Sequence, residues 1–211
     1  MLGETRRVRI TGIDQILGSI TANEEIFTKY IASKCETDEE LSKAEEDAKK
    51  VAEMEGKETI FYRDSEGNPV LKGYQIKGFL KSAAKALRGT FDVMGSGTTS
   101  QGKIDTLIFI NQDDINFYKD GKKVTDIDGY LERPLRAMTA QGPRVSLAKS
   151  EVINSGWTAE FDVTFISDVS GGRAKTYTWD TIEKMFEYGS LNGLLQWRNS
   201  GKGRFTTEWL S

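Results

Sequence analysis

The sequence contains no histidine and only one cysteine, Cys35. Without histidine, triads built on imidazole, histidine-dependent zinc sites and histidine general bases are excluded. A lone cysteine forms neither an internal disulfide nor a thiolate cluster around a metal. Any catalysis would have to use carboxylates with a bound metal, lysine or tyrosine.

Long apolar runs are missing as well. No run approaches the stretch of about 20 apolar residues with which a helix spans a bilayer, and the first residues lack the apolar block of a secretion signal. These absences predict a cytoplasmic protein with no membrane partner, and no metal or other cofactor is expected. The 211 residues, 37% of them hydrophobic and 29% charged, are typical of one globular domain spanning residues 1–211.

Charge is unevenly distributed along the chain. The net charge is −3, and the acidic residues cluster in residues 36–66. A basic surface on an acidic protein can bind a polyanion while the rest of the molecule repels it. The basic residues form three groups: Lys72, Lys77, Lys81, Lys85 and Arg88; Arg133, Arg136, Arg144 and Lys149; and Arg198, Lys202 and Arg204.

The hydrophobic pattern predicts an α+β protein. Residues 7–21 alternate loosely and are expected to form one long central strand, bulged at Gly12 or Gly18. A hairpin turn is expected at Asp120-Gly121, and Thr178 is expected to cap a helix. Further strands are predicted at 59–63, 104–110, 130–138, 144–153, 157–166 and 204–210, with a turn at 65–69 and a flexible glycine-rich loop at 95–102.

Residues 23–58 are predicted to form an acidic helical insertion after the first strand. Asn23 is expected to cap a first amphipathic helix. Thr37 and Glu40 match the capping box of a second helix, which Gly56 can end. The insertion therefore adds an acidic helical pair to an otherwise sheet-rich domain.

A helix is predicted at about residues 75–88, with an apolar stripe on one side and lysines every four residues on the other. The lysine side is either a solvated helix face or a stripe that faces phosphates. The apolar residues are Ile76, Phe79, Leu80, Ala83 and Leu87, and the lysines are Lys77, Lys81 and Lys85.

A glycine-rich loop, residues 193–204, precedes the last strand. Its glycines permit close approach of a ligand, its amides can cradle phosphate oxygens, and its basic residues add charge. Trp197 is a candidate platform for stacking on a base. The alternative is a helix-to-strand turn with solvated bases and a core tryptophan. The candidate residues are Gly193, Trp197, Arg198, Gly201, Lys202, Gly203 and Arg204.

A second basic tract covers residues 132–153. Gln141-Gly142-Pro143 is expected at the tip of an excursion between two strands. Such an extended basic loop can lie along a nucleic acid, with Arg133, Arg136 and Arg144 as the expected contacts. The alternative is an ordinary exposed hairpin.

Three motifs resemble the RAMP superfamily, the crRNA-holding proteins of CRISPR systems. The run QIKGFLKSAAKALR resembles its first helix, RPLRAMTAQG…SEVINSGWTAEFDV resembles a tract of the CRISPR backbone subunits, and GLLQWRNSGKGRF resembles its signature glycine-rich loop. The second glycine of that loop's usual GxG start is replaced here by Leu195. The resemblance implies a modified RRM-like, ferredoxin-like antiparallel sheet with long hairpin loops, in which the first helix and the glycine-rich loop flank an RNA track. It also implies copies or related backbone subunits that stack along a guide.

These observations favour a scaffold that holds RNA or single-stranded DNA and assembles along it, rather than an enzyme. One alternative is a phage-encoded mimic or inhibitor of CRISPR effector complexes, acting in the host cytoplasm and using the acidic helices at 37–55 as a decoy surface. A third is a metal-dependent nuclease. Its carboxylates would come from Asp113-Asp114 and from Asp126 and Asp128, which would share one face of a strand.

Overall fold

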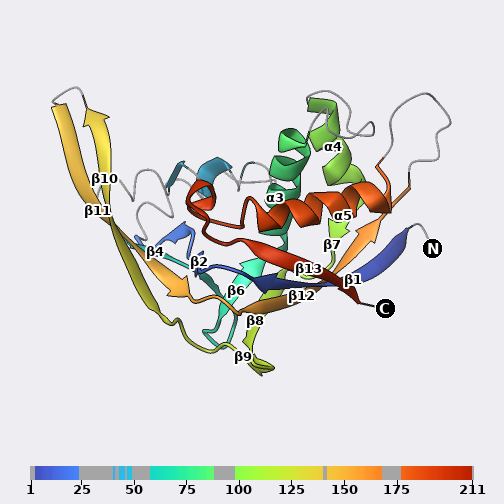
Figure 1. Ribbon diagram of the computed structural model, residues 1–211, viewed down its shortest axis with the longest axis horizontal. Coiled ribbons are helices and arrows are strands. Elements are labelled where there is room, and N and C mark those ends of the chain that lie inside the picture. Colours follow the sequence, from blue (N-terminus) through green and yellow to red (C-terminus); the bar gives the residue numbers. More distant parts are fainter. Residues whose placement is uncertain are drawn as a thin grey trace.

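The computed structural model describes residues 3–23, 40, 43–45, 47–48, 58–87, 98–139, 142–167 and 177–210. For residues 98–102, 135–139 and 142–146 it describes the backbone alone. The protein is a mixed α+β structure built on two sheets, which are mostly antiparallel (Figure 1). The predicted α+β class is therefore confirmed.

The larger sheet has eight strands within the described part of the chain and the order β13-β1-β12-β8-β6-β5, with β7 beside β12 and β9 beside β8. β1 lies between β13 and β12, so its predicted central position is confirmed. The strands are β1 (Glu4–Gly12), β5 (Tyr62–Arg63), β6 (Pro69–Lys72), β7 (Ile108–Ile110), β8 (Asp114–Lys119), β9 (Lys122–Lys123), β12 (Thr158–Phe165) and β13 (Phe205–Leu210).

The smaller sheet has the order β10-β11-β4-β3, with β2 beside β11. Its longest strands, β10 and β11, form an antiparallel hairpin that projects from the body as an arm (Figure 1). β4 pairs with β11 in parallel, the one parallel pair among the described strands. The strands are β2 (Ile16–Leu17), β3 (Ile20–Thr21), β4 (Glu58–Ile60), β10 (Gly129–Thr139) and β11 (Gly142–Ile153).

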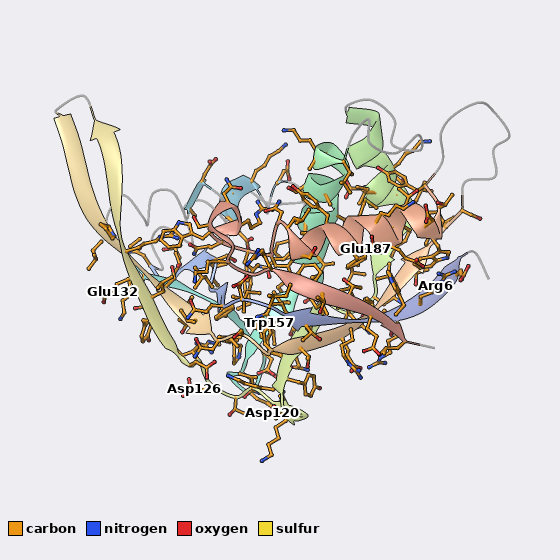
Figure 2. The ribbon with its side chains drawn as sticks, in the orientation of Figure 1. Arg6, Asp120, Asp126, Glu132, Trp157 and Glu187 are labelled. Atoms are coloured by element: carbon orange, nitrogen blue, oxygen red, sulfur yellow. The ribbon has the colours of Figure 1, made fainter. Side chains whose placement is uncertain are left out.

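Helices α3 (Gly73–Ala86) and α5 (Trp179–Glu187) cover one face of the larger sheet, and α4 (Thr98–Leu107) lies beside α3 (Figure 1). Phe79 of α3 packs edge-on against Phe205 of β13, with ring centroids 5.2 Å apart. Trp157, fully buried, lies near the centre of the molecule (Figure 2). None of the helices in the described ranges is both long and apolar enough to cross a membrane.

The single long strand expected over residues 7–21 is wrong, because the chain there divides into β1, β2 and β3. At Gly12 the backbone lies against the ring of Trp157, and a Cβ would come within 2.1 Å of the indole Nε1. At Gly18 a Cβ would lie 2.4 Å from the carbonyl carbon of Ile60. These close approaches lead the chain out of the larger sheet and into the smaller one, so the glycines end strands instead of bulging one.

The loop expected at 95–102 and the strand expected at 104–110 are also partly wrong. Helix α4 occupies residues 98–107, and only residues 108–110 form a strand. Ile104 is fully buried and Leu107, one helical turn later, packs against the core. Burial of these two side chains therefore favours a helix here, although the glycine- and serine-rich composition is typical of a loop. Pro69, expected in the turn at 65–69, is the first residue of β6.

Several local predictions are confirmed. The β8–β9 hairpin turns at Asp120 and Gly121, whose φ angles of 51° and 74° are those of a type I′ turn. The Thr178 hydroxyl accepts a hydrogen bond from the Thr181 N–H and caps α5. β12 alternates between buried and half-buried residues as its sequence predicts.

Most of the acidic segment 23–58 lies outside the described residues, including the predicted first helix. The described residues 40, 43–45 and 47–48 are helical, in agreement with the predicted second helix. The segment leaves β3 and returns at β4, and these strands are antiparallel neighbours, with the Ala22 N–H donating to the Glu58 carbonyl at 3.0 Å.

Candidate nucleic-acid interface

The C-terminal loop, defined here as residues 193–204, has a specific folded-back shape. Leu195 and Trp197 have φ angles of 60° and 56°, a left-handed conformation that residues other than glycine rarely adopt. A short 3₁₀ turn, η3 (Arg198–Ser200), follows. The Trp197 carbonyl accepts a hydrogen bond from the Lys202 N–H at 3.2 Å, which closes the loop.

Two of the loop's glycines allow the loop to pack on itself. A Cβ on Gly193 would lie 2.2 Å from the carbonyl carbon of Gly203, and a Cβ on Gly203 would lie 2.2 Å from the Leu194 carbonyl oxygen. The absence of a side chain at Gly193 and Gly203 is thus explained by packing within the loop, and close approach of a ligand to Gly203 stays a prediction. Gly201 differs, because a Cβ there would meet nothing closer than 3.5 Å, so its surroundings leave space for a ligand.

The three cations of the C-terminal loop have different surroundings. Lys202 donates from Nζ to Gln15 Oε1 at 2.8 Å, and Arg204 pairs through Nε with Asp14 Oδ2 at 2.6 Å. The Arg198 side chain makes no hydrogen bond or ion pair within the described part of the chain, although its carbonyl accepts from the Gly201 N–H at 3.1 Å. Arg198 therefore carries the least compensated charge of the loop.

Trp197 does not present both faces of its ring to solvent. The guanidinium carbon of Arg133, in β10, lies 3.2 Å from the ring centroid. Arg133 is itself only 4% exposed. In this structure the Arg133 side chain holds the C-terminal loop against the arm, and its contact with a phosphate stays a prediction.

Gln196, which the sequence analysis did not single out, lies at the centre of this contact and is fully buried. Its Nε2 donates to the Gly18 carbonyl and, at 2.7 Å, to Thr59 Oγ1, while its Oε1 accepts from Arg133 Nη2 at 3.2 Å. The Thr59 and Ser150 hydroxyls are 2.8 Å apart. One signal existed in the sequence: a lone amide within the apolar run LLQW predicts a buried polar group that needs partners.

The outer part of the arm carries two further predicted contacts. The β10–β11 register pairs Arg136 with Val145 and Arg144 with Ala137. These residues therefore lie on the arm beyond Arg133, where the backbone alone is described. Their contact with nucleic acid stays a prediction.

The α3 lysines are not gathered at the C-terminal loop. Lys77 Nζ lies 5.2 Å from the Phe109 ring centroid, and Lys81 pairs with Asp105 at 2.8 Å, so both lysines contact β7 or α4. Lys85 is exposed near the end of α3. Of the three lysines predicted to face phosphates, Lys77 and Lys81 contact neighbouring elements and Lys85 is exposed.

The open face of the larger sheet, opposite α3 and α5, contains a groove of about 790 Å³ that includes Arg7 and Arg9. Arg9 lies 2.7 Å from Glu160 and 3.0 Å from Glu208, and Arg7 lies 3.2 Å from Glu160. The Arg9 guanidinium lowers the pKa of Glu160 from its ordinary value. These arginines are neutralised by acids, which disfavours this face for a polyanion.

The four aspartates considered for a metal-dependent nuclease do not form one site in this structure. Asp113 and Asp114 both pair with Lys72, the former at 3.0 Å. Asp126 and Asp128 do not share a strand face, since residues 124–128 are not a strand. Asp126 lies on the side of the sheet away from α5 (Figure 2). The described residues include no group of three or more acidic or cysteine side chains able to hold a metal.

Two buried carboxyl groups support the fold around the arm and α3. Glu151, within the motif SEVI, accepts hydrogen bonds from the Phe61 N–H at 2.8 Å and from Arg63, and burial raises its pKa. Glu45, 8% exposed, accepts hydrogen bonds from the hydroxyls of Tyr62 and Tyr74. Burial also raises the pKa of Glu45, against the opposing effect of the two hydroxyls.

No protein-family model and no curated protein matches this sequence. Similar solved structures include a chain in the structure described as "Cryo-EM structure of the Type III-B Cmr-beta bound to cognate target RNA". The alignment has a TM-score of 0.48 and 12% identity, and it covers 99% of this chain but only 61% of that one. Similarity at this level assigns neither a family nor a ligand, so the resemblance to the RAMP superfamily stays a prediction.

Proposed function

We propose that this protein binds single-stranded nucleic acid, RNA or DNA, through its sugar-phosphate backbone. The binding surface is the junction between the C-terminal loop and the base of the β10–β11 arm. One observation carries the proposal: the Arg133–Trp197 contact holds the loop in a fixed shape against the arm, and beside it lies Arg198, which pairs with no acid among the described residues. A preformed loop with an unpaired arginine is suited to phosphate recognition, because little ordering is needed on binding.

The form of the junction favours a single strand over a duplex. Its elements are a folded loop and an extended hairpin, and neither is a helix of the kind that enters a DNA major groove. Single strands are generally bound by cationic grooves that follow the backbone. The remaining loop cations are Lys202, which contacts Gln15, and Arg204, which pairs with Asp14. They would add phosphate contacts if these interactions were exchanged for contacts with the ligand.

The order of elements supports the RRM-like interpretation that the family resemblance implies. Along the chain β1, α3, β7, β12, α5 and β13 follow one another, and in the sheet the strands run β13-β1-β12-β7. That is the β-α-β-β-α-β succession of ferredoxin-like domains. Preference for RNA, a CRISPR-like setting and side-by-side assembly of copies along the strand are further parts of the proposal.

The proposal is tested by titrating labelled single-stranded RNA, single-stranded DNA and duplex DNA with the protein at several salt concentrations. We expect the affinity for single strands to fall steeply between about 50 and 200 mM salt. Arg198→Ala is expected to weaken binding and to reduce the magnitude of the logarithmic salt slope by about 0.7, the value for one lost phosphate contact. Lys122→Ala, at the exposed β8–β9 turn, is the matched control and should change neither.

Binding that is absent, insensitive to salt or unaffected by Arg198→Ala would contradict the proposal. Nucleic acid should also co-purify with the protein and be detected by its absorbance and its sensitivity to nuclease. The length of this nucleic acid would show how many copies of the protein assemble along it. Holding, rather than cutting, is the proposed activity. Labelled RNA is therefore expected to stay intact with magnesium or manganese, and cleavage would favour the metal-dependent nuclease.

A further inference from the structure

The two sheets and the C-terminal loop meet at one buried amide. Gln196 belongs to the loop that leads into β13 of the larger sheet, yet its hydrogen-bond partners lie in or beside the smaller sheet. Gly18 joins β2 to β3, Thr59 lies in β4 and Arg133 lies in β10. A single side chain therefore connects three segments of the smaller sheet to the loop.

The surroundings of Gln196 leave it little freedom. The side chain is completely buried, and both ends of its amide are used. Loss of any of these hydrogen bonds would leave a buried polar group unsatisfied and would cost folding free energy. The three segments therefore fix the orientation of the amide, and the amide fixes the positions of the three segments relative to one another. Gly18 strengthens the restraint, because its N–H donates to the Glu151 carbonyl at 3.0 Å while its Cα lies tight against Ile60.

The arm depends on the same contact. Arg133, in the middle of β10, anchors the arm in this cluster, because it donates to Gln196 and stacks on Trp197. Any rotation of the arm would move Arg133 relative to the C-terminal loop. The geometry of the cluster thus fixes the angle between the arm and the loop.

We infer that Gln196 is a positioning residue, which sets the arm relative to the C-terminal loop and so the spacing of the cations on either side of one bound strand. It does not touch the nucleic acid itself. Its effect on affinity rests on the proposed function, whereas its effect on the position of the arm does not. A polymer bound at two points is sensitive to their spacing, because only a matched spacing lets both engage one strand.

The inference is tested by measuring the distance between spin labels on the arm and on the loop with pulsed electron paramagnetic resonance. Both labelled positions, Leu147→Cys and Ser200→Cys, are exposed, and Cys35→Ser provides a background without other thiols. The background protein should give one narrow distance distribution. Gln196→Met, which keeps the side-chain length but removes the hydrogen bonds, should broaden or shift it.

A second variant and a control separate positioning from general loss of stability. Thr59→Val removes one partner of Gln196 at nearly constant volume and should broaden the distribution to a smaller extent. Gln112→Met is the control, since that glutamine makes two hydrogen bonds with Asp162 on the open sheet face. It should lower stability without moving the labels.

The affinity for single-stranded RNA should fall roughly tenfold in Gln196→Met and stay unchanged in Gln112→Met. Unchanged label distances in both Gln196→Met and Thr59→Val would overturn the inference. If Gln196→Met fails to fold, Thr59→Val decides alone. If the unsubstituted protein binds no nucleic acid, the proposed function fails, but the label distances still test the position of the arm.

Discussion

The open sheet face and the C-terminal loop both carry arginines, but those arginines have different neighbours. On the sheet face, Arg9 is paired with Glu160 and Glu208. In the loop, Arg198 meets no acid among the described residues. Paired arginines hold strands together, whereas an uncompensated one retains its attraction for an external phosphate. The position of basic residues along a chain therefore identifies a binding surface less well than the pairing of each one.

The two regions also differ in how strongly their shape depends on glycine. Gly203→Ala is expected to destabilise the protein by about 3 kcal/mol, because the added Cβ would collide with the Leu194 carbonyl at a φ angle of 70°. Gly121→Ala, at a similar φ angle of 74° but with no atom within 4 Å, should cost only about 1 kcal/mol. Urea denaturation measures both. Equal losses would show that the loop does not pack as described.

Removing two charges from each region compares their contributions to binding. Lys202→Gln with Arg204→Gln should weaken binding of single-stranded RNA roughly tenfold, since two phosphate contacts are lost. Arg7→Gln with Arg9→Gln removes the same charge from the sheet face and should change the affinity by less than about twofold. Fluorescence anisotropy at fixed salt makes the comparison. A larger effect from the sheet-face pair would move the binding surface to the groove.

Glu45 differs from the acids of both regions, because it is buried and its hydrogen-bond donors are the neutral hydroxyls of Tyr62 and Tyr74. Its raised pKa means that the folded state binds a proton more readily than the unfolded chain, so its contribution to stability is lost as the pH rises above its ordinary pKa of 4.5. Glu45→Gln should therefore stabilise the protein at pH 8 by about 1 kcal/mol and reduce the dependence of stability on pH. Denaturation at a series of pH values measures this, and an unchanged pH profile would contradict it.

The smallest expected effect comes from Asp14, the acid that pairs with Arg204 of the loop. Asp14→Asn removes the partner of Arg204 and should tighten binding of single-stranded RNA by about twofold, because Arg204 becomes available to phosphate. The pair is partly exposed, so stability should change by less than about 1 kcal/mol. Competition titration detects the difference. Weaker binding would indicate that Asp14 positions Arg204 for the ligand.

Much of the local structure was predictable from short sequence patterns. The alternation of residues 157–166, the Asp120-Gly121 turn and the Thr178 cap each depend on a few neighbouring residues and were predicted correctly. The α4 region and the strand over residues 7–21 were not, because distant partners decided them. The burial of Ile104 and the approach of Gly12 to Trp157 leave no local pattern.

The candidate site shows the same division. The sequence by itself identified the C-terminal loop, its cations and the basic arm, because charge and glycine are visible residue by residue. Only the tertiary structure decided that Arg133 is buried against Trp197, that Gly203 packs within the loop and that Arg198 has no acidic partner in the part of the chain that is described. The physical reason is that the neighbours of a side chain within a few ångströms decide whether its charge is compensated. Those neighbours are brought together by the fold, as Gln196 and Gly18 are, although they lie far apart along the chain.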